Sequence, residues 1–343
     1  MKYSLIIAVY DRLDEVKELL ASAEDLVFPR KEFEILFVDD GSKDGFKEYI
    51  EAYVSPSSLN LRAIYQENKG PGEARNNGMA NSQAAYFIFV DSDCMFPKEW
   101  LQKIDEALVA NAWDAFGGPD TAHSSFPPLL QAINYSMTSF LGTGGTRGSK
   151  KSLAKFYPRS FNMGIRREVF EKIGGMNRLR HGQDMDFSAR IYKAGFKVGL
   201  IADAFVYHKR RTSLKKFFKQ IFNWGVARIN LAFSHPEMLK PIHFIPTFLV
   251  LGYLFLGLLS NISPFFHSLW QVLILAHLGV CILAFVQAFS ISKQLIVALY
   301  AIITLNIQVF AYGLGMLYAL LQKLRGTEEA KGFVKNYYGK KKS

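Results

Sequence analysis

The first third of the chain alternates between short apolar runs and longer segments whose apolar residues recur at helical spacing. The short runs predict buried strands at residues 5–10, 33–38, 61–65 and 85–90. The segments after them predict helices at about residues 14–26, 46–53, 72–82 and 97–110. Strands that alternate with helices in this way indicate an α/β fold with a mostly parallel sheet. Ligands of such sheets bind at the carboxyl ends of the strands.

The pattern changes after residue 240, where an apolar block runs to residue 322 with Lys293 as its single Asp, Glu, Lys or Arg. It divides into runs at about 242–260, 268–290 and 294–321. Each run is about long enough to cross a hydrocarbon core of ~30 Å. A buried helical core of a soluble domain is the alternative, but so few charges are hard to reconcile with it. We therefore expect transmembrane segments over residues 241–322.

A third pattern joins the two regions. Apolar residues recur at helical spacing, while Lys215, Lys216 and Lys219 occupy much of the remaining face. The apolar positions are Leu214, Phe217, Phe218, Ile221, Phe222, Ile229 and Phe233. A basic amphipathic helix with aromatic residues is typical of a membrane interface, and packing on the soluble domain is the alternative. The predicted domains are a catalytic domain at 1–210, an interfacial helix region at 211–238, membrane segments at 241–322 and a basic tail at 323–343.

The net charge of +11 is unevenly distributed. Residues 1–204 carry −2, residues 205–240 carry +7 and residues 323–343 carry +5. The positive charge therefore flanks the apolar block, which favours a membrane surface as partner. Because the domain with the predicted ligand sites is slightly acidic, we expect no nucleic-acid partner. The two cysteines exclude a disulfide framework.

Two acidic clusters directly follow predicted strands. Asp91 and Asp93 can hold a divalent ion against a diphosphate, because Mg²⁺ prefers one or two carboxylates plus phosphate oxygens. Asp39 and Asp40 can accept hydrogen bonds from a base N–H or a ribose hydroxyl, although a turn with a helix cap fits them as well. An isolated Asp-x-Asp is common in solvated turns, so its meaning depends on the other motifs.

A glycine-rich segment at 68–78 carries Lys69 and Arg75. Both cations can face phosphates, and ordinary surface charges are the alternative. Further along, Asp184 or Asp186 can act as a general base that takes a proton from an acceptor hydroxyl. The alternative for these two acids is the favourable placement of negative charge in the first turn of a helix.

A further strand is predicted at residues 198–201, and two basic side chains follow it and the turn at Asp203. His208 is a candidate metal ligand or phosphate-ordering group, although a single His is more often structural. Arg211 is a candidate for binding the nucleotide.

Taken in order, the motifs form a recognisable set. They are residues 4–10, Val38-Asp-Asp-Gly-Ser-Lys-Asp, residues 68–78, Asp91-Ser-Asp, Gly182-Gln-Asp-Met-Asp and His208-Lys-Arg-Arg-Thr-Ser. The set resembles the family 2 glycosyltransferases, which have the GT-A fold, over about residues 1–235. The tail is similar to those of bacterial membrane members that build exopolysaccharide or lipid-linked glycans, and Tyr312-Gly-Leu-Gly looks like a segment of such tails.

The resemblance implies inverting transfer of a sugar from a nucleotide-diphosphate sugar, with UDP-sugar as the default and Mg²⁺ or Mn²⁺ as cofactor. The acceptor would be a lipid-linked or membrane-associated glycan. By position, Asp39 and Asp40 match the nucleoside-binding pair, and Asp93, with Asp91 beside it, matches the metal ligand. Asp184 matches the catalytic base.

The sequence departs from the family pattern at three positions. Gln183 replaces the usual Glu beside the base, which leaves one carboxylate fewer near the acceptor. Ala8 stands where Pro is common, and Asp11 stands where Asn is common. None of these changes removes a group that the resemblance makes catalytic.

Two alternatives stay open beside this hypothesis. A processive polysaccharide synthase commonly carries Gln-x-x-Arg-Trp, but the nearest match, Gln220-Ile-Phe-Asn-Trp, lacks the Arg, and three spans form a poor polymer channel. A non-catalytic membrane scaffold is disfavoured because Asp93 and Asp184 are intact.

The expected location is the bacterial inner membrane, with a multi-pass chain and a cytoplasmic catalytic domain. Nucleotide sugars are cytoplasmic, the first apolar stretch is too short for a signal peptide, and eight basic residues precede the first span. Three crossings would then export the tail, whose seven basic residues favour the inside. Either the tail is exported against its charge or one apolar run does not cross.

Overall fold

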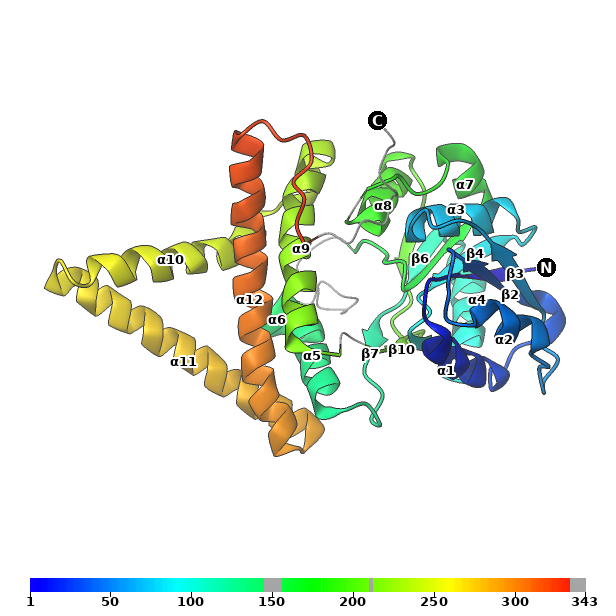
Figure 1. Ribbon diagram of the computed structural model, residues 1–343, viewed down its shortest axis with the longest axis horizontal. Helices are drawn as coiled ribbons and strands as arrows, with labels where there is room; N and C mark the ends of the chain where they lie inside the picture. Colours follow the sequence, from blue (N-terminus) through cyan, green and yellow to red (C-terminus); the bar gives the residue numbers. More distant parts are fainter. Residues whose placement is uncertain (145–155, 180, 210–211, 334–343) are drawn as a thin grey trace. The chain divides into compact units, whose positions relative to one another are not determined.

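The computed structural model describes residues 1–144, 156–179, 181–209 and 212–333 (Figure 1). These residues form two compact units. The first contains residues 1–123 and the described part of 146–209, and the second contains residues 124–144 and 212–333. Arg211 lies outside the described residues, so its predicted role stays a prediction.

A seven-stranded sheet with the order β3-β2-β1-β4-β8-β6-β9 forms the centre of the first unit. β1 (Tyr3–Val9), β2 (Phe33–Asp39), β3 (Leu61–Tyr65) and β4 (Tyr86–Val90) are parallel to one another. β8 (Asn162–Arg166) is antiparallel to β4 and β6 (Ala115–Gly117), whereas β9 (Val198–Leu200) is parallel to β6. The mostly parallel α/β fold is therefore confirmed.

Helices cover both faces of the sheet (Figure 1). α1 (Leu13–Glu24), α2 (Phe46–Ala52) and α4 (Trp100–Asn111) share one apolar core with Leu5 and Ile7. α3 (Pro71–Ala80), α7 (Arg167–Ile173) and α8 (Gln183–Lys193) share the other core with Ile6. Successive β1 side chains thus point to opposite faces, and the strand is apolar apart from the buried Ser4 because both faces are covered.

A second, small sheet has the order β5-β10-β7. It consists of β5 (Cys94–Met95), β10 (Val206–His208) and β7 (Asp120–Thr121). β10 is antiparallel to β5, with His208 opposite Cys94, and parallel to β7. The sequence pattern gave no sign of these short strands, yet they position His208 beside the Asp-x-Asp motif.

The second unit is helical and contains the three apolar runs. Its helices are α5 (Pro128–Thr138), α6 (Phe140–Thr143), α9 (Leu214–Ser234), α10 (Ile245–Leu259), α11 (Pro264–Ser292) and α12 (Leu295–Leu324). The segments Pro241–Leu259, Pro264–Ser292 and Leu295–Leu324 are long and apolar enough to cross a membrane. Three-residue and four-residue 3₁₀ turns occur at Arg30–Glu32, Pro236–Met238 and Pro241–Phe244.

The predicted amphipathic helix is present as α9. Most of its apolar stripe is covered by protein, because Phe217 and Ile221 belong to a cluster with Ile133 of α5 and Ala311 of α12. The sequence did not indicate that α5, which lies between β7 and β8 in the chain, would join the C-terminal helices. The apolar face of α9 is thus mainly a packing face.

Candidate active site

The loops after β1 and β2 are joined by three hydrogen bonds. The Asp11 N–H donates to Ser42 Oγ at 3.0 Å, the Lys43 N–H to Asp11 Oδ1 at 2.8 Å and the Leu13 N–H to Asp44 Oδ2 at 2.7 Å. Asp11 has a φ of 49°, in the left-handed region that Asn and Asp adopt more readily than other non-glycine residues. Asp11 therefore keeps the turn that an Asn in its place would form.

Asp40 is buried, and its carboxylate binds the glycine-rich loop through hydrogen bonds. Its Oδ1 accepts hydrogen bonds from Gln66 Nε2 (2.7 Å) and the Lys69 N–H (2.8 Å), and its Oδ2 accepts one from the Gly70 N–H (2.8 Å). Both carboxylate oxygens thus hold the start of α3 in place. This arrangement gives Asp40 a positioning role, while the side chain of Lys69 is exposed.

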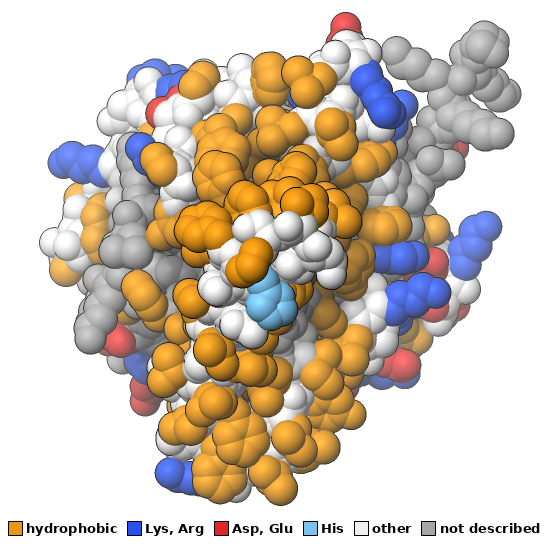
Figure 2. Space-filling view, turned by 90° about the vertical axis from the view of Figure 1, so that its left-hand side faces the viewer, with side chains coloured by type: hydrophobic (Ala, Val, Ile, Leu, Met, Phe, Trp, Pro, Cys, Tyr) orange, Lys and Arg blue, Asp and Glu red, His pale blue; other side chains and the backbone are white. Residues whose placement is uncertain are grey.

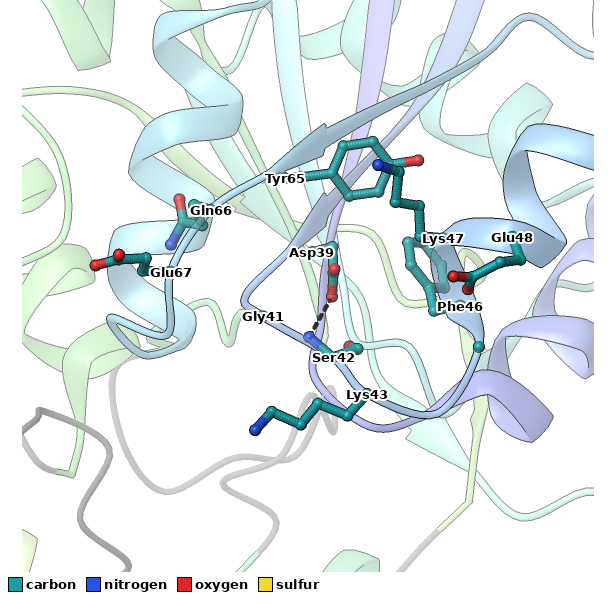
Figure 3. Close-up of a pocket in the computed structure, with 11 residues that line it drawn as sticks. Asp39, Gly41, Ser42, Lys43, Phe46, Lys47, Glu48, Tyr65, Gln66 and Glu67 are labelled. Carbon is teal, nitrogen blue, oxygen red and sulfur yellow. Dashed lines mark hydrogen bonds between the residues drawn. The ribbon is translucent and has the colours of Figure 1, made fainter.

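Asp39 lines an open pocket of about 730 Å³ at the end of β2 (Figure 3). Its Oδ1 accepts a hydrogen bond from the Ser42 N–H at 3.0 Å. Tyr65 and Gln66, at the end of the neighbouring strand β3, form another wall. The pocket therefore combines a carboxylate with an aromatic ring and lies where the parallel strands end.

Asp91 is paired with Arg75 across the carboxyl edge of the sheet. Arg75 Nη2 lies 2.6 Å from Asp91 Oδ1, and the arginine side chain is 8% exposed. The guanidinium of Arg75 is thus committed to orienting Asp91. The predicted contact of Arg75 with phosphates stays a prediction.

Asp93 lies beside His208, which β10 brings to it. His208 Nε2 is 3.1 Å from Asp93 Oδ1, and His208 Nδ1 is 3.0 Å from Asp120 Oδ2. Burial disfavours the imidazolium, but the two carboxylates outweigh it and raise the pKa of His208 to about 9. The sequence reasoning missed Asp120, because only its pairing with His208 distinguishes it from other acids.

These side chains fit a divalent metal. The ligand atoms of Asp93, Cys94 and His208 lie within 4.8 Å of one another. Burial and the nearby carboxylates raise the pKa of the Cys94 thiol well above its ordinary value, so the thiol is a poor ligand for a hard cation. Asp93 and neutral His208 remain as ligands, and Asp120 can hold the Nδ1–H tautomer that leaves Nε2 free for the ion.

Arg12, at the start of α1, is a basic residue that the sequence reasoning also missed. Its guanidinium is half-buried and pairs with Glu15 at 2.6 Å. Burial lowers the pKa of Arg12, but Asp93, Glu15 and Asp91 raise it more. Arg12 therefore contributes positive charge near the Asp-x-Asp motif.

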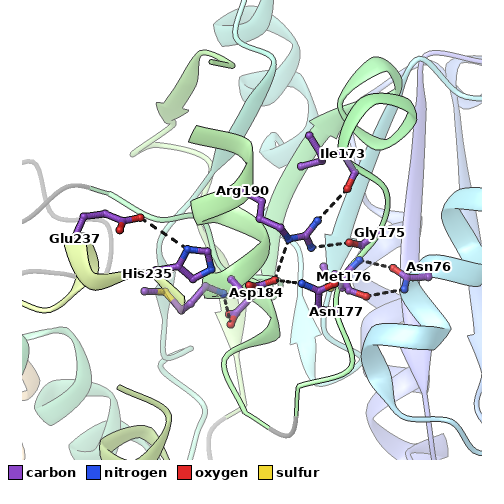
Figure 4. Close-up of polar contacts among 11 residues, drawn as sticks. Asn76, Ile173, Gly175, Met176, Asn177, Asp184, Arg190, His235 and Glu237 are labelled. Carbon is purple, nitrogen blue, oxygen red and sulfur yellow. Dashed lines mark hydrogen bonds and ion pairs between the residues drawn. The ribbon is translucent and has the colours of Figure 1, made fainter. Parts of the chain in front are cut away.

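Asp184, labelled in Figure 4 with Asn177 and Arg190, shares the first turn of α8 with Asp186, but the two acids have different surroundings. Asp186 is buried, and its Oδ2 accepts hydrogen bonds from Asn177 Nδ2 (2.9 Å) and Arg190 Nε (3.0 Å). Within the described part of the chain, the Asp184 carboxylate accepts one hydrogen bond, from the adjacent Met185 N–H at 2.9 Å. Asp186 thus has structural partners, whereas the role of Asp184 as general base stays a prediction.

Gln183 lies directly over Gly72. A Cβ atom at Gly72 would be 2.7 Å from Gln183 Nε2 and 2.8 Å from its Oε1. Gly72 is one helical turn before Arg75, which holds Asp91. The N-terminal half of α3 thus contacts Gln183 at the start of α8 and also carries Arg75, which is paired with Asp91.

Two family models match this chain. Residues 4–174 match glycosyl transferase family 2, and residues 160–316 match glycosyl transferase family group 2. The chain belongs to glycosyltransferase family 2. The matches run through the catalytic domain and into the apolar helices, as the resemblance in the motifs implied.

Relatives and solved structures agree with this assignment. The chain is 29% identical to glycosyltransferase AglE of Haloferax volcanii over 238 residues, which are 66% of this chain and 76% of AglE. It is 34% identical over 102 residues to the poly(ribitol-phosphate) beta-N-acetylglucosaminyltransferase TarS of Staphylococcus aureus. This match covers 30% of this chain and 18% of TarS. The fold is similar to that of mannosyltransferase PcManGT from Pyrobaculum calidifontis, solved with GDP-Man and Mn²⁺. That likeness has a TM-score of 0.56 at 14% identity and covers 92% of this chain and 87% of PcManGT.

Proposed function

We propose that this family 2 glycosyltransferase inverts the anomeric centre as it moves a sugar from a nucleotide-diphosphate sugar to a lipid-linked or glycan acceptor. The observation that carries the proposal is the contrast between two acids: Asp186 is held by Asn177 and Arg190, whereas Asp184 accepts one local hydrogen bond within the described residues. The proposed location is the bacterial inner membrane, with the catalytic domain in the cytoplasm. The three apolar helices and their basic flanks support it.

The donor would occupy the carboxyl edge of the sheet. Asp39, in the pocket after β2, would accept a hydrogen bond from the base or ribose, and Asp40 would keep the loop at Lys69 in place. A UDP-sugar is the default donor. GDP-sugars belong in the test because PcManGT, which shares the fold, was solved with GDP-Man.

Asp93 and His208 would hold Mg²⁺ or Mn²⁺, which when bound neutralises charge on the leaving diphosphate. Arg75 would keep the Asp91 carboxylate turned toward the same region. The cationic groups of Arg12 and Lys69 would add to the stabilisation of the diphosphate.

Asp184 would take the proton from the acceptor hydroxyl as the hydroxyl oxygen attacks the anomeric carbon. The bond from that carbon to the diphosphate oxygen breaks on the opposite face, and the electron pair leaves with the diphosphate. A single displacement inverts the configuration, so this mechanism requires no enzyme nucleophile.

The decisive experiment is a transfer assay with full-length protein in its membrane fraction, using a panel of UDP- and GDP-sugars. Wild type should release nucleoside diphosphate from one of the donors, and this release should require acceptor lipid. Asp184→Asn should not release nucleoside diphosphate under the same conditions. Release that is equal in both proteins for every donor would reject the enzyme function and favour the scaffold alternative.

A further inference from the structure

The segment after α12 lies along α9. The Asn230 side chain exchanges two hydrogen bonds with the backbone of Ala330, at 2.9 and 3.0 Å. Two turns earlier on α9, the Asn223 side chain exchanges two with the backbone of Phe333, at 2.8 and 2.7 Å. Ala330 is 1% exposed. The chain beyond the last apolar helix is therefore fixed to the helix that precedes the first one.

α9 stays on the side of the catalytic domain. It begins six residues after β10 ends, a stretch that spans at most ~20 Å. It carries Lys215, Lys216, Lys219 and, in its C-terminal half, Arg228. Charges in the centre of a bilayer cost several kcal/mol, so α9 is a poor candidate for crossing. Whatever is fixed to α9 should share its side.

α12 packs closely along α9. A Cβ atom at Gly225 of α9 would be 2.2 Å from the Tyr312 carbonyl oxygen, and one at Gly315 of α12 would be 2.1 Å from the Phe222 carbonyl oxygen. The two backbones therefore touch, which glycine alone permits. The Tyr312-Gly-Leu-Gly segment thus serves as the contact between these two helices.

The contact continues to the ends of both helices. The Lys323 ammonium is 4.3 Å from the centroid of the Phe233 ring, eight residues beyond the Gly315–Gly225 contact on both helices. α9 and α12 therefore lie side by side and point the same way (Figure 1). If α9 does not cross the membrane, α12, aligned with it, does not cross either.

The other half of α12 contacts α5. Thr304 Oγ1 of α12 donates to the Ala132 carbonyl at 3.1 Å, and Tyr135 Oη of α5 donates to Gln287 of α11 at 3.0 Å. α5 has 11 residues, too few to span a bilayer, and the described residues up to 123 and from 156 to 209, on either side of it in the chain, belong to the catalytic domain. The junction of α11 and α12, which carries Lys293, therefore also belongs on the side of the catalytic domain.

α10 and α11 form a V whose tip lies at residues 260–263 and whose open end lies on α12 (Figure 1). Only 6% and 11% of their apolar windows are buried in protein, against 39% for α12. Hydrophobic side chains cover much of the face that looks onto the tip of this V (Figure 2). Exposed apolar side chains of this kind require lipid or another apolar partner.

Polar side chains fix the V to α12. The Tyr253 hydroxyl of α10 is hydrogen-bonded to His277 Nδ1 of α11, and His277 Nε2 is 2.8 Å from Asn306 Oδ1 of α12. Thr247, at the start of α10, donates to the Gly313 carbonyl of α12 at 3.4 Å. These contacts fix the orientation of the V relative to α12. Because the V projects sideways from α12 (Figure 1), the V and α12 cannot both lie along the membrane normal.

We propose that only the α10–α11 hairpin crosses the bilayer, while α12 lies with α9 at the membrane surface. Two crossings return the chain to the side of the catalytic domain. This arrangement places Lys293 and the basic tail on the same side as the eight basic residues of 205–240, as the positive-inside tendency requires. It explains the conflict between three apolar runs and a basic C-terminus, and it does not depend on the proposed transfer reaction.

The test uses full-length protein in sealed membrane vesicles of both orientations and a membrane-impermeant maleimide. Three variants each add one cysteine at an exposed position: Lys31→Cys in the catalytic domain, Asn261→Cys at the hairpin tip and Glu328→Cys after α12. The unsubstituted chain measures background from Cys94 and Cys281. We expect Glu328→Cys to react in the same vesicles as Lys31→Cys, and Asn261→Cys to react only in vesicles of the opposite orientation.

Two results would overturn the topology. Reaction of Glu328→Cys on the side opposite to Lys31→Cys means three crossings. Reaction of Asn261→Cys on the side of Lys31→Cys, or on neither side, means that the hairpin does not traverse the bilayer. None of these readouts requires catalytic activity, so a failed transfer assay and a failed topology are separate results.

Discussion

His208 Nε2 lies 3.1 Å from Asp93 Oδ1, although more than a hundred residues separate the two in the sequence. The pairing of β10 with β5 brings them together, and Asp120 on β7 fixes the other nitrogen of the imidazole. A carboxylate and a carboxylate-supported imidazole are suited to hold the proposed divalent metal at the edge of the sheet where we expect the donor phosphates.

Asp93→Asn should abolish sugar transfer, because the substitution removes the carboxylate that faces His208. Excess EDTA should likewise remove activity from the wild type, and Mn²⁺ or Mg²⁺ should restore it. The matched control is Asp203→Asn, which changes an exposed carboxylate in the turn before β10. Full activity of the wild type in EDTA would contradict the metal role.

Asp184→Asn should lower kcat by about 10²–10⁴-fold, with little change in the KM for the donor, because a general base acts mainly in the transition state. Its thermal stability should be close to that of the wild type, since the side chain accepts one local hydrogen bond.

Asp186→Asn should show the opposite behaviour. Removal of one partner from its buried pair with Arg190 leaves a cation without its counter-ion, at a cost of about 3 kcal/mol or more in the free energy of unfolding. Calorimetry should detect the loss, and transfer at a temperature where the variant is folded should persist. A stable but inactive Asp186→Asn would move the base to that residue.

Gly72→Ala should impair catalysis through Gln183. The new Cβ would lie under 3 Å from the Gln183 amide, so the end of that side chain must leave its place over α3, next to Asp184 in the sequence. We expect kcat to fall more than donor affinity. Gln183→Ala in the same chain removes the clash and should restore much of the activity; failure of this rescue would show that Gly72 acts in another way.

Stability of the metal-free protein should depend on the protonation of His208. Its pKa is raised from 6.5 in the unfolded chain to about 9 in the folded one, so the imidazolium stabilises the fold fully below pH 6.5. This contribution, on the order of 3 kcal/mol, is lost as the pH rises through 9. In EDTA, the difference in Tm between wild type and His208→Gln should therefore shrink from pH 6.5 to pH 9.5. A constant difference would contradict the ion pair.

Three of the first four strands, β1, β2 and β4, could be read from the sequence because they are mostly apolar and almost wholly buried, whereas β3 is a partly exposed strand at the edge of the sheet. Asp39, Asp91 and Asp93 could be identified because acids directly after such strands meet at one edge of the sheet. The side chains that interact with these acids could not be identified in the same way. Asp120 and Arg12 become visible only through contacts made by short strands and by the start of a helix, which leave little trace in hydrophobic periodicity.

The apolar runs illustrate a second limit. By length and hydropathy, α12 is a candidate membrane span in the same way as α10 and α11. Length and hydropathy cannot show that small residues of α12 contact neighbouring helices, as Gly313 contacts α10 and Gly315 contacts α9. Which neighbour covers an apolar helix, protein or lipid, is a property of the tertiary structure.

The docking of the C-terminal segment on α9 should loosen when its two asparagines are truncated. Asn223→Ala with Asn230→Ala removes four hydrogen bonds to the backbone of Ala330 and Phe333, each worth about 1 kcal/mol. In an Ala330→Cys protein, whose cysteine replaces a side chain that is 1% exposed in the docked segment, the rate of maleimide labelling should rise by at least about tenfold, because 1.4 kcal/mol already corresponds to that factor. Gln220→Ala, on the same helix, is the matched control and should leave the rate unchanged. The side of the membrane on which Glu328→Cys reacts should also stay the same, because the two hairpin crossings, and not these hydrogen bonds, determine it. An unchanged rate in the double variant would show that the segment is held by other contacts.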